Sequence, residues 1–197
     1  LRQQSKKTAA AVNMSLADFI APKETGKTDY IGGFVVTTGH GIEEHIARFE
    51  ADHDDYNSIM IKALADRLAE AFAELMHEKV RAAYWGYAAN ENLPNEELIK
   101  ESYKGIRPAP GYPACPNHTL KTELFKILNA TELTGVNLTE SLAMYPTAAV
   151  SGMYFGNEEA KYFGVGKIEK DQVQAYADAS NLTFDEAEKW VSANLNY

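Results

Sequence analysis

The chain has 197 residues, of which 45% are hydrophobic and 24% charged, and this composition is typical of a globular protein and not of a disordered one. Its formal net charge of −9 argues against nonspecific nucleic-acid binding, which needs a clustered excess of Lys and Arg, and an acidic surface also repels anionic membranes. The sequence has neither an apolar run of membrane-spanning length nor a signal-peptide pattern, and its single cysteine excludes an internal disulfide, so we expect a cytoplasmic protein.

The N-terminal half is predicted to form part of one compact unit that is rich in helices. Residues 1–14 are polar and Lys-rich, which predicts a linker or a frayed helix end, and Ser15 is the expected cap of a short helix over 16–20. The spacing of the hydrophobic residues then predicts a strand over 29–38 and helices over 42–50 and 54–84.

The segment from Asp54 to Tyr84 is the longest periodic stretch and is predicted to be the central helix of the fold. Apolar residues recur in it at three- and four-residue spacing, which predicts one buried stripe: Ile61, Leu64, Leu68, Phe72, Leu75 and Met76. The opposite side, which includes Glu70, is by default a solvated face. The acidic cluster at residues 52–55 is either a metal site or a set of charges that favours the N-terminus of this helix.

The C-terminal half mixes further helices with β-rich runs. Caps, periodicity and turn residues predict helices over 96–103, 120–128, 171–179 and 184–195, and strands over 134–140, 148–155 and 161–168. Asn95 is the expected cap of the first of these helices, whose last turn holds Glu101, and Thr183 with Glu186 forms a capping box for the last. We expect the last two strands to form a hairpin, and the helices do not alternate regularly with the strands. Both features favour an α+β fold with a bent antiparallel sheet.

Residues 107–119 stand apart because four prolines fall within ten residues. Proline fixes its own φ and lacks an N–H, so we expect a stiff, extended ribbon whose carbonyls are free to bind a ligand. Gly111 would let a ligand approach the backbone, while Arg107 and Tyr112 supply a fork of donors and an aromatic face. A proline-rich surface connection between two helices explains the composition equally well.

The side chains near this ribbon suggest what the ligand is. Arg107 suits a carboxylate, with which its planar fork forms two charge-assisted hydrogen bonds. Glu70 and Glu101 could supply negative charge. The aromatic residues that could flank a flat base or a cation are Tyr112, Tyr162 and Phe163. S-adenosylmethionine carries a carboxylate, a purine and a positive centre, so it would use all of these groups.

Four segments of the chain resemble the C-terminal activation domain of cobalamin-dependent methionine synthase. They are residues 54–74, 84–87, 105–119 and 151–155. The Arg-x-x-x-Gly-Tyr element at Arg107, Gly111 and Tyr112 is distinctive, and the order and spacing of the other segments agree with the family. The resemblance covers nearly the whole chain.

The resemblance implies a site for S-adenosylmethionine, with no catalytic residue and no metal ligand. Arg107 would hold the methionine carboxylate, the following ribbon would contact the adenosyl group through its backbone, and two acidic residues would line the pocket. The site residues that it implies are Arg107, Pro108, Ala109, Gly111, Tyr112, Tyr162, Phe163, Glu70 and Glu101.

The resemblance also implies a role in reactivation. In the family, the activation domain docks on cobalamin held by a neighbouring domain and transfers a methyl group to it from S-adenosylmethionine, while a reductase, flavodoxin in many bacteria, supplies an electron. The alternative is a noncatalytic module that senses S-adenosylmethionine and docks a cobalamin domain or a flavodoxin-type partner. A methyltransferase for another nucleophile lacks support, because no glycine-rich strand-to-helix loop is present.

The family's domain begins well before the position of Leu1. The resemblance therefore implies that residues 1–197 are a single, N-terminally incomplete activation domain from a larger multidomain enzyme, inactive by itself. The preceding stretch carries an aspartate that contacts the amino group of the ligand in the family.

Overall fold

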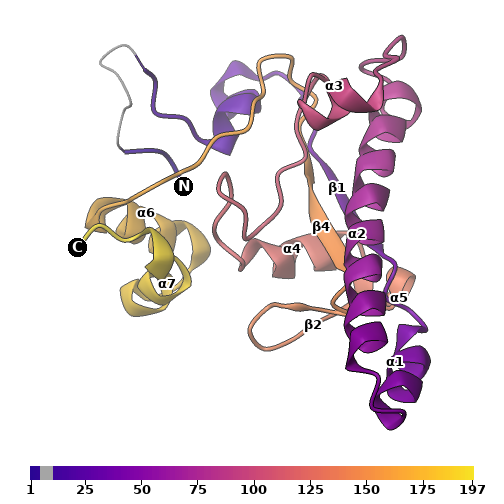
Figure 1. The fold of residues 1–197 in the computed structure, drawn as a ribbon. Coiled ribbons are helices and arrows are strands. Elements are labelled where there is room, and N and C mark those ends of the chain that lie inside the picture. The colour runs from indigo at the N-terminus through magenta and orange to yellow at the C-terminus, as the bar shows by residue number, and fades with distance from the viewer. Residues whose placement is uncertain (5–10) are drawn as a thin grey trace. The chain divides into compact units, whose positions relative to one another are not determined.

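The computed structural model describes residues 1–4 and 11–197 and is drawn in Figure 1. Residues 5–10, which belong to the predicted linker, lie outside the described residues. The chain divides into two compact units. Unit 1 comprises Leu1–Gly32, Lys104–Leu120 and Met153–Tyr197, and unit 2 comprises Gly33–Tyr103 and Lys121–Gly152. The single activation domain over residues 1–197 stays a prediction.

Helices dominate the described residues. The α-helices are α1 (Ile42–Ala51), α2 (Asp55–Lys79), α3 (Asn95–Ile99), α4 (Leu120–Ile127), α5 (Ala130–Thr134), α6 (Lys170–Ser180) and α7 (Phe184–Trp190). Short 3-10 turns lie at Leu16–Phe19, Lys23–Thr25 and Ser192–Asn194, and a π-helical turn lies at Val80–Tyr84. The strands are β1 (Gly32–Thr37), β2 (Asn137–Leu138), β3 (Met144–Tyr145) and β4 (Ala149–Tyr154). The predicted α+β class and the long helix are confirmed.

The strands form two antiparallel pairs, β1 with β4 and β2 with β3. Thr38, just after β1, donates its N–H to the carbonyl of Ala148, just before β4, at 3.0 Å. The predicted hairpin between residues 148–155 and 161–168 is wrong, because β4 pairs with β1 and residues 161–167 contain no strand. The apolar side chains of that second run pack in the core of unit 1 instead.

Helix α2 buries a different side from the predicted one. Its buried side chains are Ser58, Ala65, Ala69, Ala73 and His77. Ala65 and Ala69 pack with Ala148 and Val150, so the helix lies alongside the β1–β4 pair (Figure 1). The predicted stripe is wrong: Leu64, Leu68, Phe72 and Leu75 are exposed, and Ile61 and Met76 are only half-buried. Alanine permits a close approach of the helix to the strands, and periodicity alone does not distinguish it from leucine.

Two of the three predicted helix caps are present in the structure. Ser15 and Thr183 both form complete capping boxes, which confirms them as helix starts. Asn95 is not a cap, because α3 begins at Asn95 itself after Pro94. This helix is also shorter than predicted, so that Glu101 lies beyond its end with a φ of 58°. In the predicted strand over residues 134–140, only the two residues of β2 are in a strand.

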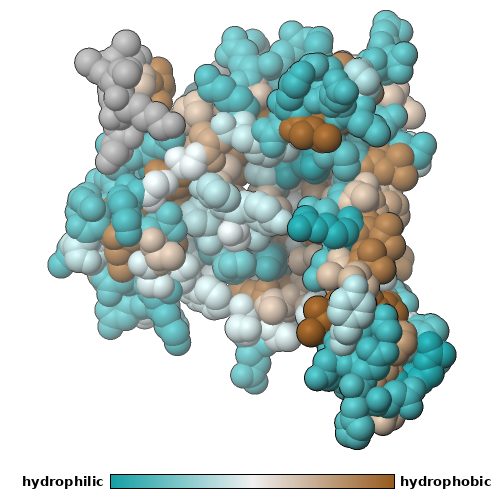
Figure 2. Space-filling model, viewed as in Figure 1, coloured by the Kyte–Doolittle hydropathy of each residue, from teal (hydrophilic) through white to brown (hydrophobic). Residues whose placement is uncertain are grey.

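Each unit has its own apolar clusters. In unit 1, Val165 and Ile168 pack with buried side chains of α6 and α7, among them Val173 and Ala187. Phe19, Ile106 and Phe155 form a second cluster. In unit 2, one cluster joins α2 to β4 and another surrounds Phe125, Ala130 and Val136. Hydropathy is mapped on one face of the molecule in Figure 2. Of the helices in the described part of the chain, none combines the length and apolarity that crossing a membrane requires.

Candidate functional site

The proline-rich segment belongs to unit 1 and begins as an extended strip. Ile106 exchanges backbone hydrogen bonds with Phe155, both at 3.0 Å, and the carbonyl of Pro108 accepts the N–H of Met153 at 3.0 Å. Residues 107–109 are in neither helix nor strand, as the prolines predict. The strip therefore lies against residues 153–155 and is fixed by backbone pairing.

Beyond Ala109 the segment turns back on itself. The N–H of Tyr112 donates to the carbonyl of Ala109 at 3.1 Å, and the N–H of Cys115 donates to the carbonyl of Tyr112 at 2.9 Å. Gly111 closes the turn through its N–H, which donates to the carbonyl of Cys115 at 2.7 Å. The predicted stiff ribbon with free carbonyls is therefore wrong between Ala109 and Cys115, because these carbonyls and that of Pro113 accept hydrogen bonds within unit 1.

The structure brings Arg107 together with the late segment of the predicted site. The backbone N–H of Arg107 donates to the hydroxyl of Tyr162 at 3.0 Å, across 55 positions of sequence. Tyr162 packs against the cluster of Phe19, Ile106 and Phe155, and Phe163 meets the ring of Phe19 edge-on with centroids 6.4 Å apart. These contacts fix the start of the proline-rich segment and leave the guanidinium of Arg107 out of this hydrogen bond.

Gly111 lies against the imidazole of His118. A Cβ on this residue would come within 2.3 Å of Cε1 of His118, and its φ is 101°. Both the turn and the neighbouring histidine therefore require glycine at this position. The sequence does not predict the contact with His118. Tyr112 beside it is 51% exposed, while Pro108 and Ala109 are buried.

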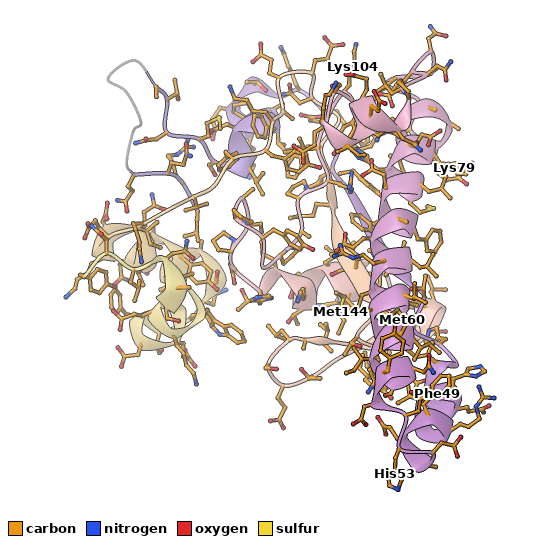
Figure 3. The ribbon with its side chains drawn as sticks, viewed as in Figure 1. Phe49, His53, Met60, Lys79, Lys104 and Met144 are labelled. Atoms are coloured by element: carbon orange, nitrogen blue, oxygen red, sulfur yellow. The ribbon has the colours of Figure 1, made fainter. Side chains whose placement is uncertain are left out.

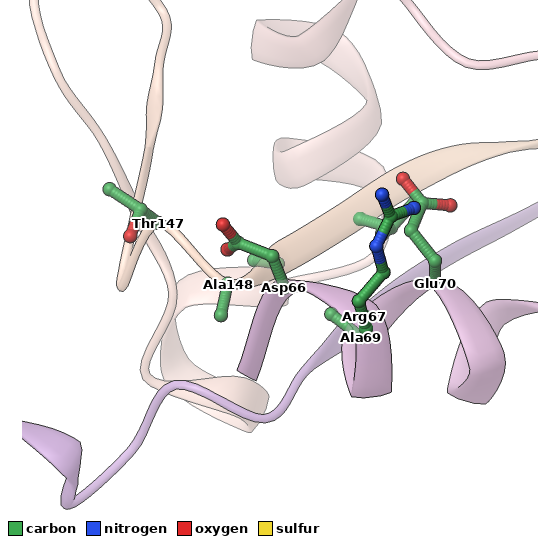
Figure 4. Close-up of a pocket in the computed structure, with 8 residues that line it drawn as sticks. Asp66, Arg67, Ala69, Glu70, Thr147 and Ala148 are labelled. Carbon is green, nitrogen blue, oxygen red and sulfur yellow. The ribbon is translucent and has the colours of Figure 1, made fainter. Parts of the chain in front are cut away.

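The two acidic candidates belong to unit 2, whereas the other seven predicted residues belong to unit 1. Glu70 lies on α2 and lines a pocket of about 380 Å³ with Asp66, Arg67 and residues 147–150. Figure 4 shows Asp66, Arg67 and Glu70 on α2 with Thr147 and Ala148 on the neighbouring segment. Glu101 is exposed after α3.

Unit 1 also contains a larger pocket of about 740 Å³, which none of the nine predicted residues lines. Most of its lining is apolar. Its polar wall is built on Asn117, whose Oδ1 accepts hydrogen bonds from the N–H and hydroxyl of Thr119, both at 2.8 Å, and from the hydroxyl of Tyr176 at 2.9 Å. Burial raises the pKa of the Tyr176 hydroxyl, and its hydrogen bonds oppose that shift. No sequence motif marks Tyr176, so this network is not predictable from the sequence.

The family is decided by a comparison with known sequences. The family described as "Vitamin B12 dependent methionine synthase, activation domain" matches residues 1–181. The chain belongs to this family. The matched range includes all nine predicted site residues and extends through both units of the chain to just beyond α6.

A solved structure agrees with this assignment. It is described as the crystal structure of the MetH reactivation domain bound to AdoHcy, and it is 58% identical in sequence with a TM-score of 0.95. The match covers 100% of this chain and 60% of the solved chain. This activation domain chain therefore spans about three-fifths of the length of the relative that it matches.

The single cysteine of the chain lies beside the larger pocket. Cys115 is buried there, and burial raises the pKa of its thiol to about 11, which keeps it protonated at neutral pH.

Within residues 1–4 and 11–197, no group of three or more His, Cys, Asp or Glu side chains is placed to hold a metal ion. Of the acidic cluster at residues 52–55, Asp54 caps α2, because its carboxylate accepts the N–H of Asn57 at 3.0 Å.

Proposed function

We propose that this activation domain binds S-adenosylmethionine and supports the reductive methylation of cob(II)alamin held by a neighbouring domain of cobalamin-dependent methionine synthase. The observation that carries the proposal is the hydrogen bond from the Arg107 N–H to the Tyr162 hydroxyl, which joins two segments predicted to share one ligand. The AdoHcy of the solved relative supports the ligand class, because it is S-adenosylmethionine without the transferred methyl group.

The proposed roles follow from the chemistry of the ligand. The Arg107 guanidinium holds the methionine carboxylate, and the exposed ring of Tyr112 packs on the adenosyl group. Tyr162 and Phe163 support the segment that carries Arg107, with backbone contacts from residues 108–111. The ligand carries a sulfonium, and Glu70 and Glu101 are the proposed sources of compensating negative charge.

The reaction needs a methyl group and one electron. The C–S bond of S-adenosylmethionine breaks as the methyl group moves to cobalt, and AdoHcy leaves, while a flavodoxin-type reductase supplies the electron. Neither a general base nor a protein nucleophile is required, so the residues of this chain contribute alignment and charge placement.

The proposal includes the setting of the domain. The two units form one activation domain of a larger multidomain methyltransferase in the cytoplasm, and its partners are the cobalamin-binding domain of the same polypeptide and the reductase. The family match across both units and the greater length of the solved relative support this organisation.

Calorimetric titration with S-adenosylmethionine tests the binding step. We expect Arg107→Ala to weaken binding about 10- to 100-fold, since hydrogen bonds between charged groups contribute about 1.5–3 kcal/mol. Arg107→Lys keeps the charge but loses the planar fork, and we expect intermediate affinity. The control is Lys104→Ala, which removes an equal charge from an exposed pair with Glu158. Equal affinities for wild type and Arg107→Ala would contradict the assigned role.

A second experiment separates reactivation from the alternative of a noncatalytic sensing module. The domain is mixed with the cobalamin-binding domain, S-adenosylmethionine and a chemical reductant, and the absorption spectrum is followed. Formation of methylcobalamin supports reactivation, whereas association of the two domains without methylation favours the sensing module.

A further inference from the structure

The 740 Å³ pocket of unit 1 combines buried and exposed walls. Phe155, Cys115 and Tyr176 form its buried part, with exposed fractions of 3%, 6% and 8%. Ile31 and Leu120 also line it, and they are 54% and 41% exposed. A pocket of this volume accommodates a small molecule, and such a ligand would cover the apolar side chains that now face water.

The lining of this pocket selects against charge. Among the described residues that line it, no side chain is charged at neutral pH. Burial raises the pKa of its two ionisable groups, the thiol of Cys115 and the hydroxyl of Tyr176, so both stay protonated. Charged residues of unit 1 such as Lys104 (Figure 3), which pairs with Glu158, lie outside the lining. A charged ligand would lose its hydration there without gaining a partner, so the expected occupant is neutral.

The polar wall of the pocket offers a hydrogen-bond acceptor to a ligand. The hydroxyl of Tyr176 donates its single proton to Oδ1 of Asn117 at 2.9 Å. The side chain of Ser180 hydrogen-bonds the same tyrosine hydroxyl, so Ser180 is the donor in that contact. The oxygen of Ser180 therefore keeps its lone pairs for a further donor. Since Ser180 lines the pocket, an O–H or N–H group of a ligand finds its acceptor there.

We propose that this pocket binds a neutral, largely apolar small molecule of the phenol or indole class, whose O–H or N–H group donates to the hydroxyl of Ser180. The rings of Phe155 and Tyr176 in the lining suit a flat aromatic ligand. Water is a poor occupant, because most of the lining gives it no hydrogen-bonding partner. None of the nine residues assigned to S-adenosylmethionine lines the pocket, so this inference does not depend on the proposed function.

Fluorescence titration of residues 1–197 with 2-naphthol tests the proposal. We expect saturable binding, and we expect the bound probe to emit as the neutral naphthol, because excited 2-naphthol loses its proton only where water accepts it. The matched probe is 2-methoxynaphthalene, which has the same rings but no O–H group. Ser180→Ala should weaken the binding of 2-naphthol about 2- to 10-fold, the effect of one hydrogen bond, and leave that of 2-methoxynaphthalene unchanged.

A substitution that fills the pocket gives an independent reading. Ala179 is an exposed residue of α6 that lines the pocket, and Ala179→Trp should weaken the binding of both probes by about tenfold or more, since the indole takes the place of the ligand. The matched control is Ala175→Trp, one turn earlier on the same helix, where the alanine is also exposed but is not part of the lining. This control should leave both affinities unchanged. Urea unfolding of each variant verifies that it is folded.

The competing outcomes are distinct. Absence of saturable 2-naphthol binding, or equal affinities for wild type and Ala179→Trp, would overturn the proposal. An equal effect of Ser180→Ala on the two probes would contradict the assigned hydrogen bond. Displacement of 2-naphthol by S-adenosylmethionine would overturn a separate site, whereas an unchanged 2-naphthol affinity at saturating S-adenosylmethionine supports it. Binding of 2-naphthol in a chain that does not bind S-adenosylmethionine would support this pocket and contradict the proposed function alone.

Discussion

Gly111 shows how one residue can be fixed by its neighbours instead of by a ligand. Its φ of 101° lies in a region that residues with a Cβ rarely adopt, and the imidazole of His118 occupies the place of a side chain. The sequence predicts a glycine that lets a ligand approach the backbone, but it predicts neither the turn nor the contact with His118, because that contact depends on the path of residues 112–117. The position thus has a structural role that holds whether or not a ligand approaches it.

Gly111→Ala should destabilise the chain by about 3 kcal/mol or more, because it adds a steric clash to a backbone cost of about 1–2 kcal/mol. The measurement is the free energy of unfolding in urea. Gly166→Ala is the matched control, since Gly166 has a φ of 73° with no atom within 4 Å of the added Cβ. A second substitution, His118→Ala, should recover the steric part. Equal losses of unfolding free energy in Gly111→Ala and Gly166→Ala would show that the contact with His118 adds nothing to the cost at position 111.

Cys115 should react slowly with alkylating agents. Burial raises the pKa of its thiol to about 11, so the thiolate fraction at pH 8 is on the order of 100-fold lower than that of a free cysteine with a pKa of about 8.5. We expect iodoacetamide labelling at pH 8 to be slower by at least that factor, and urea to restore the ordinary rate. Because the folded-state pKa is raised, the related contribution to stability is complete below about pH 8.5 and is lost as the pH rises toward 11. Rapid labelling of the folded chain would contradict this environment.

At the scale of elements, the end of α2 is fixed by a buried ion pair. In the π-helical turn that follows α2, the Nε and Nη2 of Arg81 lie 2.7 and 2.6 Å from Oε1 of Glu91, and the guanidinium lies 4.4 Å from the ring centroid of Tyr103. The side chain of Arg81 is fully buried and that of Glu91 is 10% exposed. These contacts join the end of the long helix to the segments before and after α3 within unit 2.

Glu91→Gln should destabilise unit 2 by about 3 kcal/mol, because it leaves the buried charge of Arg81 without compensation. The control is Glu97→Gln, which removes one partner of the exposed pair with Lys100 and should cost less than about 1 kcal/mol. Both values come from urea unfolding followed by circular dichroism. A similar small cost for the two variants would show that the Arg81 pair contributes no more than a surface pair.

The same elements show what the sequence could predict. Helix α2 and the capping boxes at Ser15 and Thr183 follow from periodicity and local hydrogen bonding, and the structure confirms them. The buried face of α2 does not follow, because the alanines pack on strands whose position is set by contacts distant in sequence. Residues 161–168 have strand-like composition for a different reason, since their apolar side chains fill the core of unit 1.

For the whole molecule, the nine predicted residues are divided unevenly between the two units. Seven of the nine predicted residues belong to unit 1. The family resemblance predicts that Arg107 and Tyr162 share one ligand, but no pattern in the sequence predicts the hydrogen bond between them. The network of Asn117 and Tyr176 lies outside this set because hydrogen-bonding partners 59 positions apart leave no periodic signal. Glu70 and Glu101 are therefore the members whose contribution most needs a measurement.

The two tryptophans of the chain allow that measurement, since Trp190 lies in unit 1 and Trp85 in unit 2. In Trp85→Phe, fluorescence reports on unit 1, and S-adenosylmethionine at 100 times its Kd should stabilise this unit by about 2.7 kcal/mol. Arg107→Ala should reduce this stabilisation to about 0.4–1.4 kcal/mol at the same concentration, because its binding is expected to be about 10- to 100-fold weaker. In Trp190→Phe, the signal reports on unit 2, and any rise in its urea midpoint measures the contribution of Glu70 and Glu101, which Glu70→Gln and Glu101→Gln should then remove. A ligand that leaves the Trp190 transition unchanged at saturation would contradict the proposed site in unit 1.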